Sequence, residues 1–177
     1  AKNWRPTIAV LSGAPNQRLG IVQFAQWIGS RSGIISLVNI LEGDLADLQD
    51  EAHDARKRLL KFAEDSGLNV FPEVIVCRDY DSQLSVFLQS HSIGPIKPNV
   101  IMMGWPQQVD RIAPYYGHLR TIQQLGKAIV IAVNRGFMPG RLQRRIDCWW
   151  RGRENGSMMV TLAHLVMLNA DWRPCRL

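Results

Sequence analysis

Ile34-Ile35-Ser36-Leu37-Val38-Asn39-Ile40-Leu41 is an almost unbroken apolar run in which Ser36 and Asn39 are the polar members. A strand of this composition has little polar surface to offer water on either side. Runs of this kind are typical of parallel strands, which are covered by helices on both faces of the sheet. The segment therefore predicts an inner strand of a parallel sheet.

On both sides of this run, expected strands alternate with expected helices along the whole chain. Strands are expected at 7–11, 34–41, 70–77, 99–103, 128–133 and 146–150, and helices at 17–30, 45–66, 114–125, 157–168 and after Asp81. This alternation predicts an α/β fold, a mostly parallel doubly wound sheet with helices on both faces. No repeat or linker divides the chain, so we expect one domain over 1–177.

Several local signals indicate where these elements begin and end, and which of them lie at the edge of the sheet or in the core. Asp44 is a suitable N-cap for the longest helix, and Gly67 is placed to end it in the left-handed conformation. Asp81 is expected to cap the helix that follows it. Pro72 lacks a backbone N–H, so the strand at 70–77 is expected at an edge of the sheet. The segment 157–168 is apolar nearly all round, which predicts a core helix.

The composition fits one globular domain that lacks a membrane-spanning segment. The chain has 177 residues, of which 46% are hydrophobic and 20% charged. No apolar run approaches the roughly 18 residues that suggest a transmembrane helix. The chain begins with Ala1 and stops where a further strand should start, so we expect a piece of a longer polypeptide. Cys77, Cys148 and Cys175 form no C-x-x-C pair, which is typical of buried free thiols in a reducing compartment.

The chain is basic, with a formal net charge of +6. Such a balance fits nucleic acid, a membrane surface or a basic domain with no polyanionic partner. The densest stretch holds Arg135, Arg141, Arg144, Arg145, Arg151 and Arg153, against Asp147 as the one carboxylate over that span. Anionic lipid, an acidic partner and a solvated loop all remain open for it. The signatures of common RNA-binding modules are missing, so nucleic acid is not expected.

No catalytic or metal-binding motif stands out in the sequence. The chain has no G-x-G-x-x-G, no Walker A pattern and no nucleophile elbow. The four histidines are scattered and have no cysteine or carboxylate at metal-ligand spacing. We therefore expect a protein that is not an enzyme and holds neither a metal nor a cofactor.

One crevice is a candidate binding site, at the carboxyl ends of the strands. If the first and fourth strands are neighbours, Ser12 and Gly13 face Gly104 where the strand order reverses, the usual ligand site of such sheets. Glu42 ends the second strand and is placed to accept a ribose hydroxyl. The alternative is that both glycines only form turns. The glycines that normally surround phosphates are missing, so we expect weak or no ATP binding.

Four short tryptophan motifs resemble those of a known family. They are Asn3-Trp4-Arg5-Pro6, Met103-Gly104-Trp105-Pro106, Ile146-Asp147-Cys148-Trp149-Trp150 and Trp172-Arg173-Pro174-Cys175. In order and spacing, they resemble the cytosolic C-terminal domain of the cation–chloride cotransporters, a prokaryotic member of the K–Cl or Na–K–Cl group. The likeness extends from Asn3 to Arg176. Trp149 and Trp150 are expected on opposite faces of one strand, with at least one of them deeply buried.

The resemblance implies a function that the residues alone do not indicate. It implies a cytosolic regulatory domain that helps to hold a membrane transporter as a homodimer, joined to a transmembrane domain absent from this chain. It also implies a fold like that of the universal stress proteins. An excess of large apolar side chains late in the chain, such as Trp149, Met158 and Met159, fits self-association. The alternatives are a nucleotide-binding protein of the universal stress type and, further away, a basic nucleic-acid-binding domain.

Overall fold

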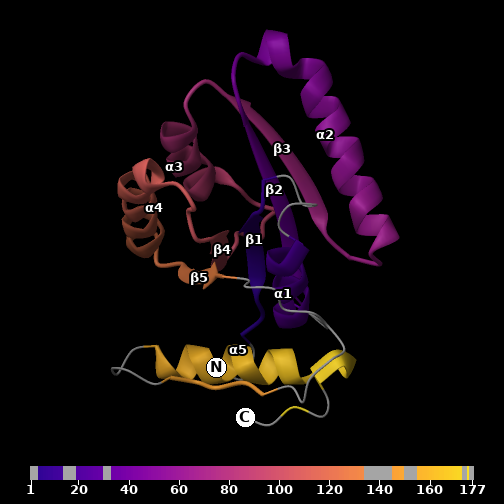
Figure 1. The fold of residues 1–177 in the computed structure, drawn as a ribbon, viewed down its shortest axis with the longest axis vertical. Coiled ribbons are helices and arrows are strands. Elements are labelled where there is room, and N and C mark those ends of the chain that lie inside the picture. Colours follow the sequence, from indigo (N-terminus) through magenta and orange to yellow (C-terminus); the bar gives the residue numbers. More distant parts are fainter. Residues whose placement is uncertain are drawn as a thin grey trace.

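The computed structural model describes residues 4–13, 19–29, 33–133, 145–149, 155–172 and 175. Strands and helices alternate through most of them (Figure 1). The elements are β1 (Thr7–Leu11), α1 (Leu19–Gly29), β2 (Ile34–Glu42), α2 (Leu45–Asp65), β3 (Phe71–Cys77), α3 (Tyr80–Ser90), β4 (Val100–Gly104), the 3-10 helix η2 (Val109–Arg111), α4 (Ile112–Gln124), β5 (Ala128–Ala132), α5 (Gly156–Met167) and the 3-10 helix η3 (Ala170–Trp172).

The five strands form one parallel sheet in the order β3-β2-β1-β4-β5. The predicted α/β class is therefore confirmed, whereas the likeness to universal stress proteins stays a prediction. β1 lies between β2 and β4, so the strand order reverses at the β1–β4 pair. β3 forms an edge, as Pro72 predicted.

Helices cover both faces of the sheet, because successive strand residues point to opposite sides. Along β1, Ile8 and Val10 join one hydrophobic cluster, whereas Ala9 and Leu11 join the other. The first cluster packs under α1, α2 and α5, and the second packs under α3 and α4. All five β1 residues are buried, which is what a central strand with two covered faces requires.

The predicted start and end of the longest helix are confirmed. The Asp44 side chain accepts a hydrogen bond from the Ala46 amide, and Gly67 follows the helix with a φ of +61°. The prediction for the next helix was wrong by two residues. Asp79 is its N-cap, since the Asp79 carboxylate accepts a 2.8 Å hydrogen bond from the Ser82 amide. The Asp81 side chain is therefore not used as the cap, and it points toward another helix.

The sixth strand expected at 146–150 does not form in the part of it that the structure describes. Residues 146–149 have no regular secondary structure, and the described sheet ends at β5. Trp149 is 84% exposed, so the expectation of deep burial is wrong for this tryptophan. Trp150 and the arginines at 135, 141, 144, 151 and 153 lie outside the described residues.

α5 is less buried than its apolar sequence predicted. It lies at one end of the molecule, beside α1 (Figure 1). Gly156, Ala163 and Val166 are buried against the core, whereas Val160 is 41% exposed. The helix therefore covers the core with one face, and its other face is exposed. No helix among the described residues is both long and apolar enough to cross a bilayer.

A half-buried histidine at the end of α3 links this helix to the sheet. His91 Nε2 lies 3.0 Å from Ser36 Oγ on β2, and the His91 ring stacks on Phe87. Burial is the main effect on the pKa of His91 and lowers it. The negative charge of Glu73 raises this pKa, and the positive charge of Lys127 lowers it. The folded chain therefore favours the neutral imidazole.

We expect this histidine to make the fold less stable in mild acid. The unfolded chain, whose histidine pKa is about 6.5, binds the proton more readily than the folded chain. The stabilising contribution is present above that pKa and is lost as the pH falls through it. Urea denaturation at pH 7.5 and 5.5 should show a larger loss for the wild type than for His91→Gln. Equal losses in both proteins would contradict this assignment.

Candidate functional site

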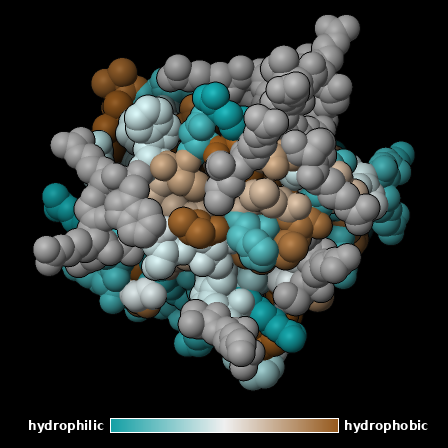
Figure 2. Space-filling view, turned by 90° about the horizontal axis from the view of Figure 1, so that it is seen from below, coloured by the Kyte–Doolittle hydropathy of each residue, from teal (hydrophilic) through white to brown (hydrophobic). Residues whose placement is uncertain are grey.

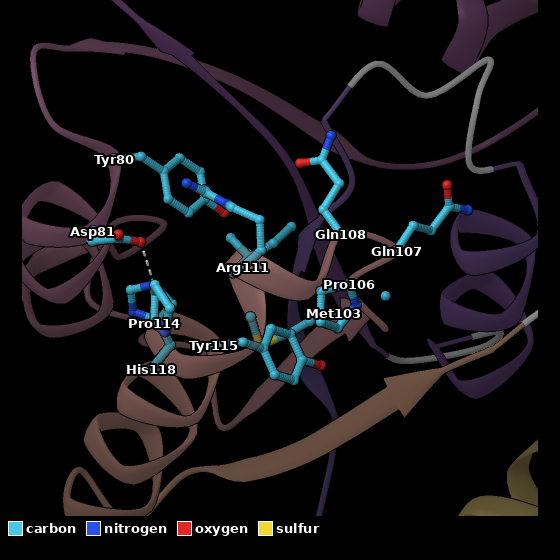
Figure 3. Close-up of a pocket in the computed structure, with 12 residues that line it drawn as sticks. Tyr80, Asp81, Met103, Pro106, Gln107, Gln108, Arg111, Pro114, Tyr115 and His118 are labelled. Atoms are coloured by element: carbon cyan, nitrogen blue, oxygen red, sulfur yellow. Dashed lines mark hydrogen bonds and ion pairs between the residues drawn. The ribbon is translucent and has the colours of Figure 1, made fainter.

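A pocket of about 310 Å³ opens at the carboxyl ends of β1 and β4, where the strand order reverses (Figure 3). This is the position at which open α/β sheets usually bind ligands. Its lining comes from both strands, the first turn of α3, η2 and α4. The described lining residues are Leu11, Tyr80, Asp81, Met103, Gly104, Pro106, Gln107, Gln108, Arg111, Pro114, Tyr115 and His118.

The strand ends and the segment after β4 shape the floor of this pocket. β4 ends at Gly104, which is buried and pairs with Ala132 of β5. The chain then leaves the sheet through Trp105 and Pro106. The Trp105 ring contacts the Tyr115 ring edge-on, with 5.7 Å between the ring centroids. This contact fixes the strand-to-helix connection against α4.

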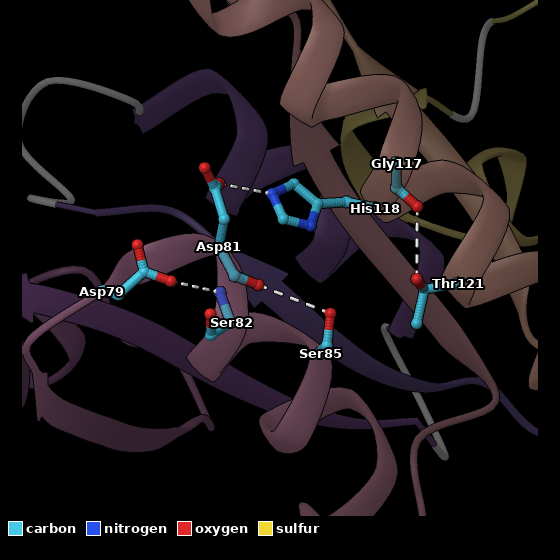
Figure 4. A network of polar contacts seen from close by, with 7 residues as sticks. All are labelled: Asp79, Asp81, Ser82, Ser85, Gly117, His118 and Thr121. Atoms are coloured by element: carbon cyan, nitrogen blue, oxygen red, sulfur yellow. Dashed lines mark hydrogen bonds and ion pairs between the residues drawn. The ribbon is translucent and has the colours of Figure 1, made fainter.

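A hydrogen bond between two side chains joins α3 to α4 at one side of the pocket. His118 Nε2 lies 2.8 Å from Asp81 Oδ1, and Figure 4 shows the two side chains meeting between their helices. The His118 side chain is 8% exposed and the Asp81 side chain 39%. Asp81 thus keeps a solvent-facing side from which it can accept hydrogen bonds from a ligand, while His118 is held behind it.

A cation–π contact joins the same two parts of the chain. The Arg111 guanidinium lies 5.2 Å from the centre of the Tyr80 ring, and Figure 3 shows it stacked over that ring. Such contacts are worth about 0.5–1 kcal/mol at exposed sites. Together with Asp81 and His118, this contact links the first turn of α3 to η2 and α4 at two places.

The structure brings one of the four candidate residues predicted from the sequence to the pocket. Gly104 lines it, whereas Ser12, Gly13 and Glu42 are not among the described lining residues. Ser12 is fully buried, and its amide donates to the carbonyls of Val10 and Val38. Gly13 has a φ of +60°, so it serves the turn after β1.

Glu42 lies apart because β1 separates its strand from β4. Adjacent strands are about 4.8 Å apart, so two strand spacings of roughly 10 Å separate β2 from β4. Glu42 pairs in register with Cys77 at the end of β3. Burial raises the pKa of the Cys77 thiol, and the negative charges of Glu42 and Asp79 raise it further. These effects therefore favour the protonated thiol, which is a weaker nucleophile than the thiolate.

A second depression lies at the ends of β2 and β3, and both of its carboxylates are hydrogen-bonded. Its described lining residues are Gly43, Asp44, Leu45, Val76, Cys77, Arg78, Asp79 and Gln83. Asp44 Oδ2 accepts from Arg78 Nη2 at 2.6 Å and from Arg78 Nε at 3.0 Å. Hydrogen bonds from Ser82 lower the pKa of Asp79. These contacts secure the starts of α2 and α3.

The pocket residues that sequence reasoning missed are Asp81, Arg111, Tyr115 and His118. Asp81 and His118 are 37 residues apart and come from two helices, so no sequence motif connects them. The one available signal was the position of Asp81 in a first helical turn, which was interpreted as a cap. Among the described residues, no group of three or more His, Cys, Asp or Glu side chains is placed to hold a metal.

Comparison with known proteins adds little to this picture. No family model matches the chain. Among solved structures, the proposed methyltransferase Lpg2936 from Legionella pneumophila, solved with bound SAM, is 13% identical with a TM-score of 0.38. The match covers 90% of this chain and 65% of that one. A hypothetical protein is 12% identical with a TM-score of 0.37, over 93% of this chain and 68% of its own. Likenesses this distant carry no conclusion about activity or cofactor.

Proposed function

We propose that this chain is a cytosolic regulatory and dimerisation domain of a secondary transporter for electroneutral cation–chloride cotransport. The observation that carries the proposal is the place of Met103-Gly104-Trp105-Pro106, one of the motifs shared with that family. Three of its four residues, Met103, Gly104 and Pro106, line the pocket where the strand order reverses. A motif that shapes a ligand-sized pocket fits a domain that receives a regulatory signal.

The other family-like tryptophans divide into structural and exposed ones. Trp4 packs against the first hydrophobic cluster and Trp172 is part of it, so both serve the fold. Trp149 serves no such purpose, because it is 84% exposed. The family-like motifs therefore have three different places in the structure. Trp4 and Trp172 belong to the core, Met103-Gly104-Trp105-Pro106 lies at the pocket, and Trp149 lies on the surface.

The pocket chemistry favours binding over catalysis. Its described lining contains no serine, threonine, cysteine or lysine, and its carboxylate and imidazole, from Asp81 and His118, are hydrogen-bonded to each other. The histidine and the arginine are engaged with Asp81 and with the Tyr80 ring. These contacts hold the two helices at a set distance, so a ligand that disturbs them would move α3 relative to α4.

The direct test is ion transport by the full-length polypeptide that contains this chain. Chloride-dependent rubidium uptake should occur in cells that express it. Trp105→Ala should change the rate of uptake, since it disturbs the pocket, while leaving the dependence on chloride intact. Val109→Ala is a matched control, because Val109 is 83% exposed on the neighbouring η2. Absence of chloride-dependent uptake would remove the transporter assignment.

A nucleotide-binding protein of the universal stress type is the second candidate. It is favoured by the pocket at the reversal of strand order and by Gly104 on its floor. Pro106 supplies no backbone N–H for a phosphate, so we expect ATP to bind weakly or not at all. Isothermal titration with ATP and AMP distinguishes the candidates. A sub-micromolar dissociation constant that Gly104→Leu abolishes would favour the nucleotide-binding protein.

We expect the chain to self-associate as a homodimer with a dissociation constant in the micromolar range, about −8 kcal/mol. The family resemblance implies the dimer. Exposed apolar side chains at the end of β5 and just after it offer area for it, since Ile131 is 38% and Val133 is 58% exposed. Sedimentation equilibrium over a wide range of concentrations measures the association. A strictly monomeric species at high concentration would contradict it.

A further inference from the structure

The pocket at the reversal of strand order keeps hydrogen-bond donors that the fold does not use. Arg111 lines it, with the guanidinium 5.2 Å from the centre of the Tyr80 ring. A guanidinium that stacks over a ring uses its flat face, and its five N–H donors point outward in its own plane. Among the described residues, no oxygen atom accepts a hydrogen bond from the Arg111 side chain. These donors are therefore open to a ligand.

Asp81 offers hydrogen-bond acceptors close to these donors. Its Oδ1 atom lies 2.8 Å from His118 Nε2, whereas its Oδ2 atom accepts no hydrogen bond from the residues that the structure describes. Asp81 directly follows Tyr80, and Figure 3 shows Asp81 and Arg111 beside this same ring. The contacts of Asp81 and Arg111 in the described structure do not include an ion pair between them. Both side chains can therefore bind one small ligand.

These two side chains determine the charge that a ligand needs. Apart from the His118 imidazole, they are the charged side chains of the described lining, one of each sign. A phosphate or another multiply charged anion would be repelled by Asp81, and an organic cation would be repelled by Arg111. A ligand with one carboxylate and one ammonium group gives each side chain an opposite charge. The guanidinium fork also matches a carboxylate with two parallel hydrogen bonds.

Buried apolar side chains form another part of the pocket. Leu11 and Met103 are buried at the strand ends, and Tyr115 is buried on α4. They suit a compact apolar group of the ligand. The pocket volume of about 310 Å³ is near the lower limit of the roughly 300–1,000 Å³ that is typical of small-molecule sites. This volume favours a ligand smaller than a nucleotide.

We propose that this pocket binds a free α-amino acid with an apolar side chain of medium size. Its carboxylate pairs with the Arg111 guanidinium, and its ammonium group donates to Asp81. Its side chain packs on the buried residues at the strand ends and on α4. Both charged groups sit on one carbon atom, which suits two protein side chains that lie beside the same ring. Because Asp81 belongs to α3 and Arg111 to η2, the bound amino acid joins these two elements.

The apolar surfaces elsewhere on the described structure do not suit such a ligand. A cavity of about 320 Å³ lies between α1, the end of β5 and η3, and its lining includes Phe24, Trp27 and Trp172. No charged side chain is among the described residues that line it. Apolar residues also gather in the middle of the α5 end of the molecule (Figure 2). An amino acid placed on either surface would lose the hydration of its two charges without gaining partners.

Isothermal titration of the 177-residue chain with L-leucine, L-methionine and L-phenylalanine tests the proposal. At least one of them should bind with a dissociation constant below about 100 μM. Analogues of the best binder identify its contacts; for L-leucine they are L-leucinamide, which lacks the carboxylate, and 4-methylpentanoate, which lacks the ammonium group. Each analogue should bind at least about tenfold more weakly, because a hydrogen bond between charged groups is lost. Glycine should also bind at least about tenfold more weakly, since it has no side chain to bury.

Two substitutions assign the charged groups of the ligand to their partners. Arg111→Gln should weaken binding of the amino acid at least about tenfold without weakening binding of its amide. Asp81→Asn should weaken binding of the amino acid by a similar factor without weakening binding of the analogue that lacks the ammonium group. Arg120→Gln and Asp110→Asn make the same charge changes at exposed residues outside the described lining, so they should leave binding unchanged. Circular dichroism confirms that each variant is folded, and the comparison of analogues needs the wild type alone.

The regulatory meaning of this site rests on the proposed transporter function, but the two are tested separately. Titration measures the site in the chain, whereas chloride-dependent rubidium uptake measures the transporter in the full-length polypeptide. Amino-acid binding without uptake would support the site and remove the transporter assignment. Uptake without amino-acid binding would support the transporter assignment and remove the site.

Three results would overturn the proposed amino-acid site. The first is that all three amino acids bind with dissociation constants above about 100 μM. The second is that either analogue binds as tightly as the amino acid from which it derives. The third is wild-type binding of the amino acid by Arg111→Gln or by Asp81→Asn.

Discussion

Trp172→Ala is expected to destabilise the fold by about 3–5 kcal/mol, a large part of the roughly 5–15 kcal/mol that holds a domain folded. Trp172 is 8% exposed and belongs to the hydrophobic cluster under α1 and α5. Its ring meets the Trp27 ring edge-on at a centroid distance of 5.1 Å. Removing it opens a large cavity between η3 and α1 and leaves Trp27 without this partner.

Trp149→Ala is the matched control, since it removes the same side chain from the surface. Because Trp149 is 84% exposed, its loss should change the free energy of unfolding by no more than about 0.5 kcal/mol. Urea denaturation followed by circular dichroism gives both values, provided that the slope with denaturant is unchanged. A loss above about 1 kcal/mol in Trp149→Ala, or below that value in Trp172→Ala, would contradict the burial described here.

The architecture was predictable because its signals are local and agree with one another. The apolar run around Leu37 and Val38 identified an inner parallel strand, and Pro72 identified an edge. Asp44 and Gly67 marked the ends of α2 through capping and a positive φ. Each of these features depends on a few neighbouring residues, so the sequence displays it directly.

The position of the pocket could be predicted, because it follows from the order of the strands. Its chemistry could not be predicted, because it depends on contacts between helices. The assumption that β1 and β4 are neighbours was right, which placed Gly104 correctly. Glu42 does not line this pocket, because every parallel strand ends at the same edge of the sheet and sequence does not show which ends are adjacent. The pairing of Asp81 with His118 arises from the packing of α3 on α4 and leaves no sequence pattern.

The error at residues 146–150 has a different physical origin. Apolar and aromatic residues there were interpreted as a buried strand, since burial is the usual fate of tryptophan. A strand also needs a hydrogen-bonded neighbour, and residues 146–149 have none that makes a ladder. Hydrophobic composition therefore does not by itself specify that the fold buries these residues.

Gly33→Ala is expected to destabilise the fold by about 1–3 kcal/mol, the range of other overpacking substitutions. A Cβ atom at this position would lie 2.6 Å from Gly29 Cα, 2.9 Å from Gly29 O and 3.0 Å from Pro6 O. All three are backbone atoms, so no side-chain rotation relieves the contact. The same backbone is held in place by hydrogen bonds from Gly33 N to Gly29 O and from Ile34 N to Pro6 O. The backbone at Gly29, Gly33 or Pro6 must therefore shift to accept the methyl group.

Gly117→Ala should have the opposite effect, although the chemical change is identical. Gly117 lies inside α4, and a Cβ atom there would meet nothing within 4 Å. Alanine should then stabilise the helix by about 0.5–1 kcal/mol, because glycine loses more conformational freedom on folding. Urea denaturation of the two variants should move the midpoint in opposite directions. A rise of both midpoints would show that backbone entropy, rather than the close approach of Gly33 to Gly29 and Pro6, governs this substitution in the chain.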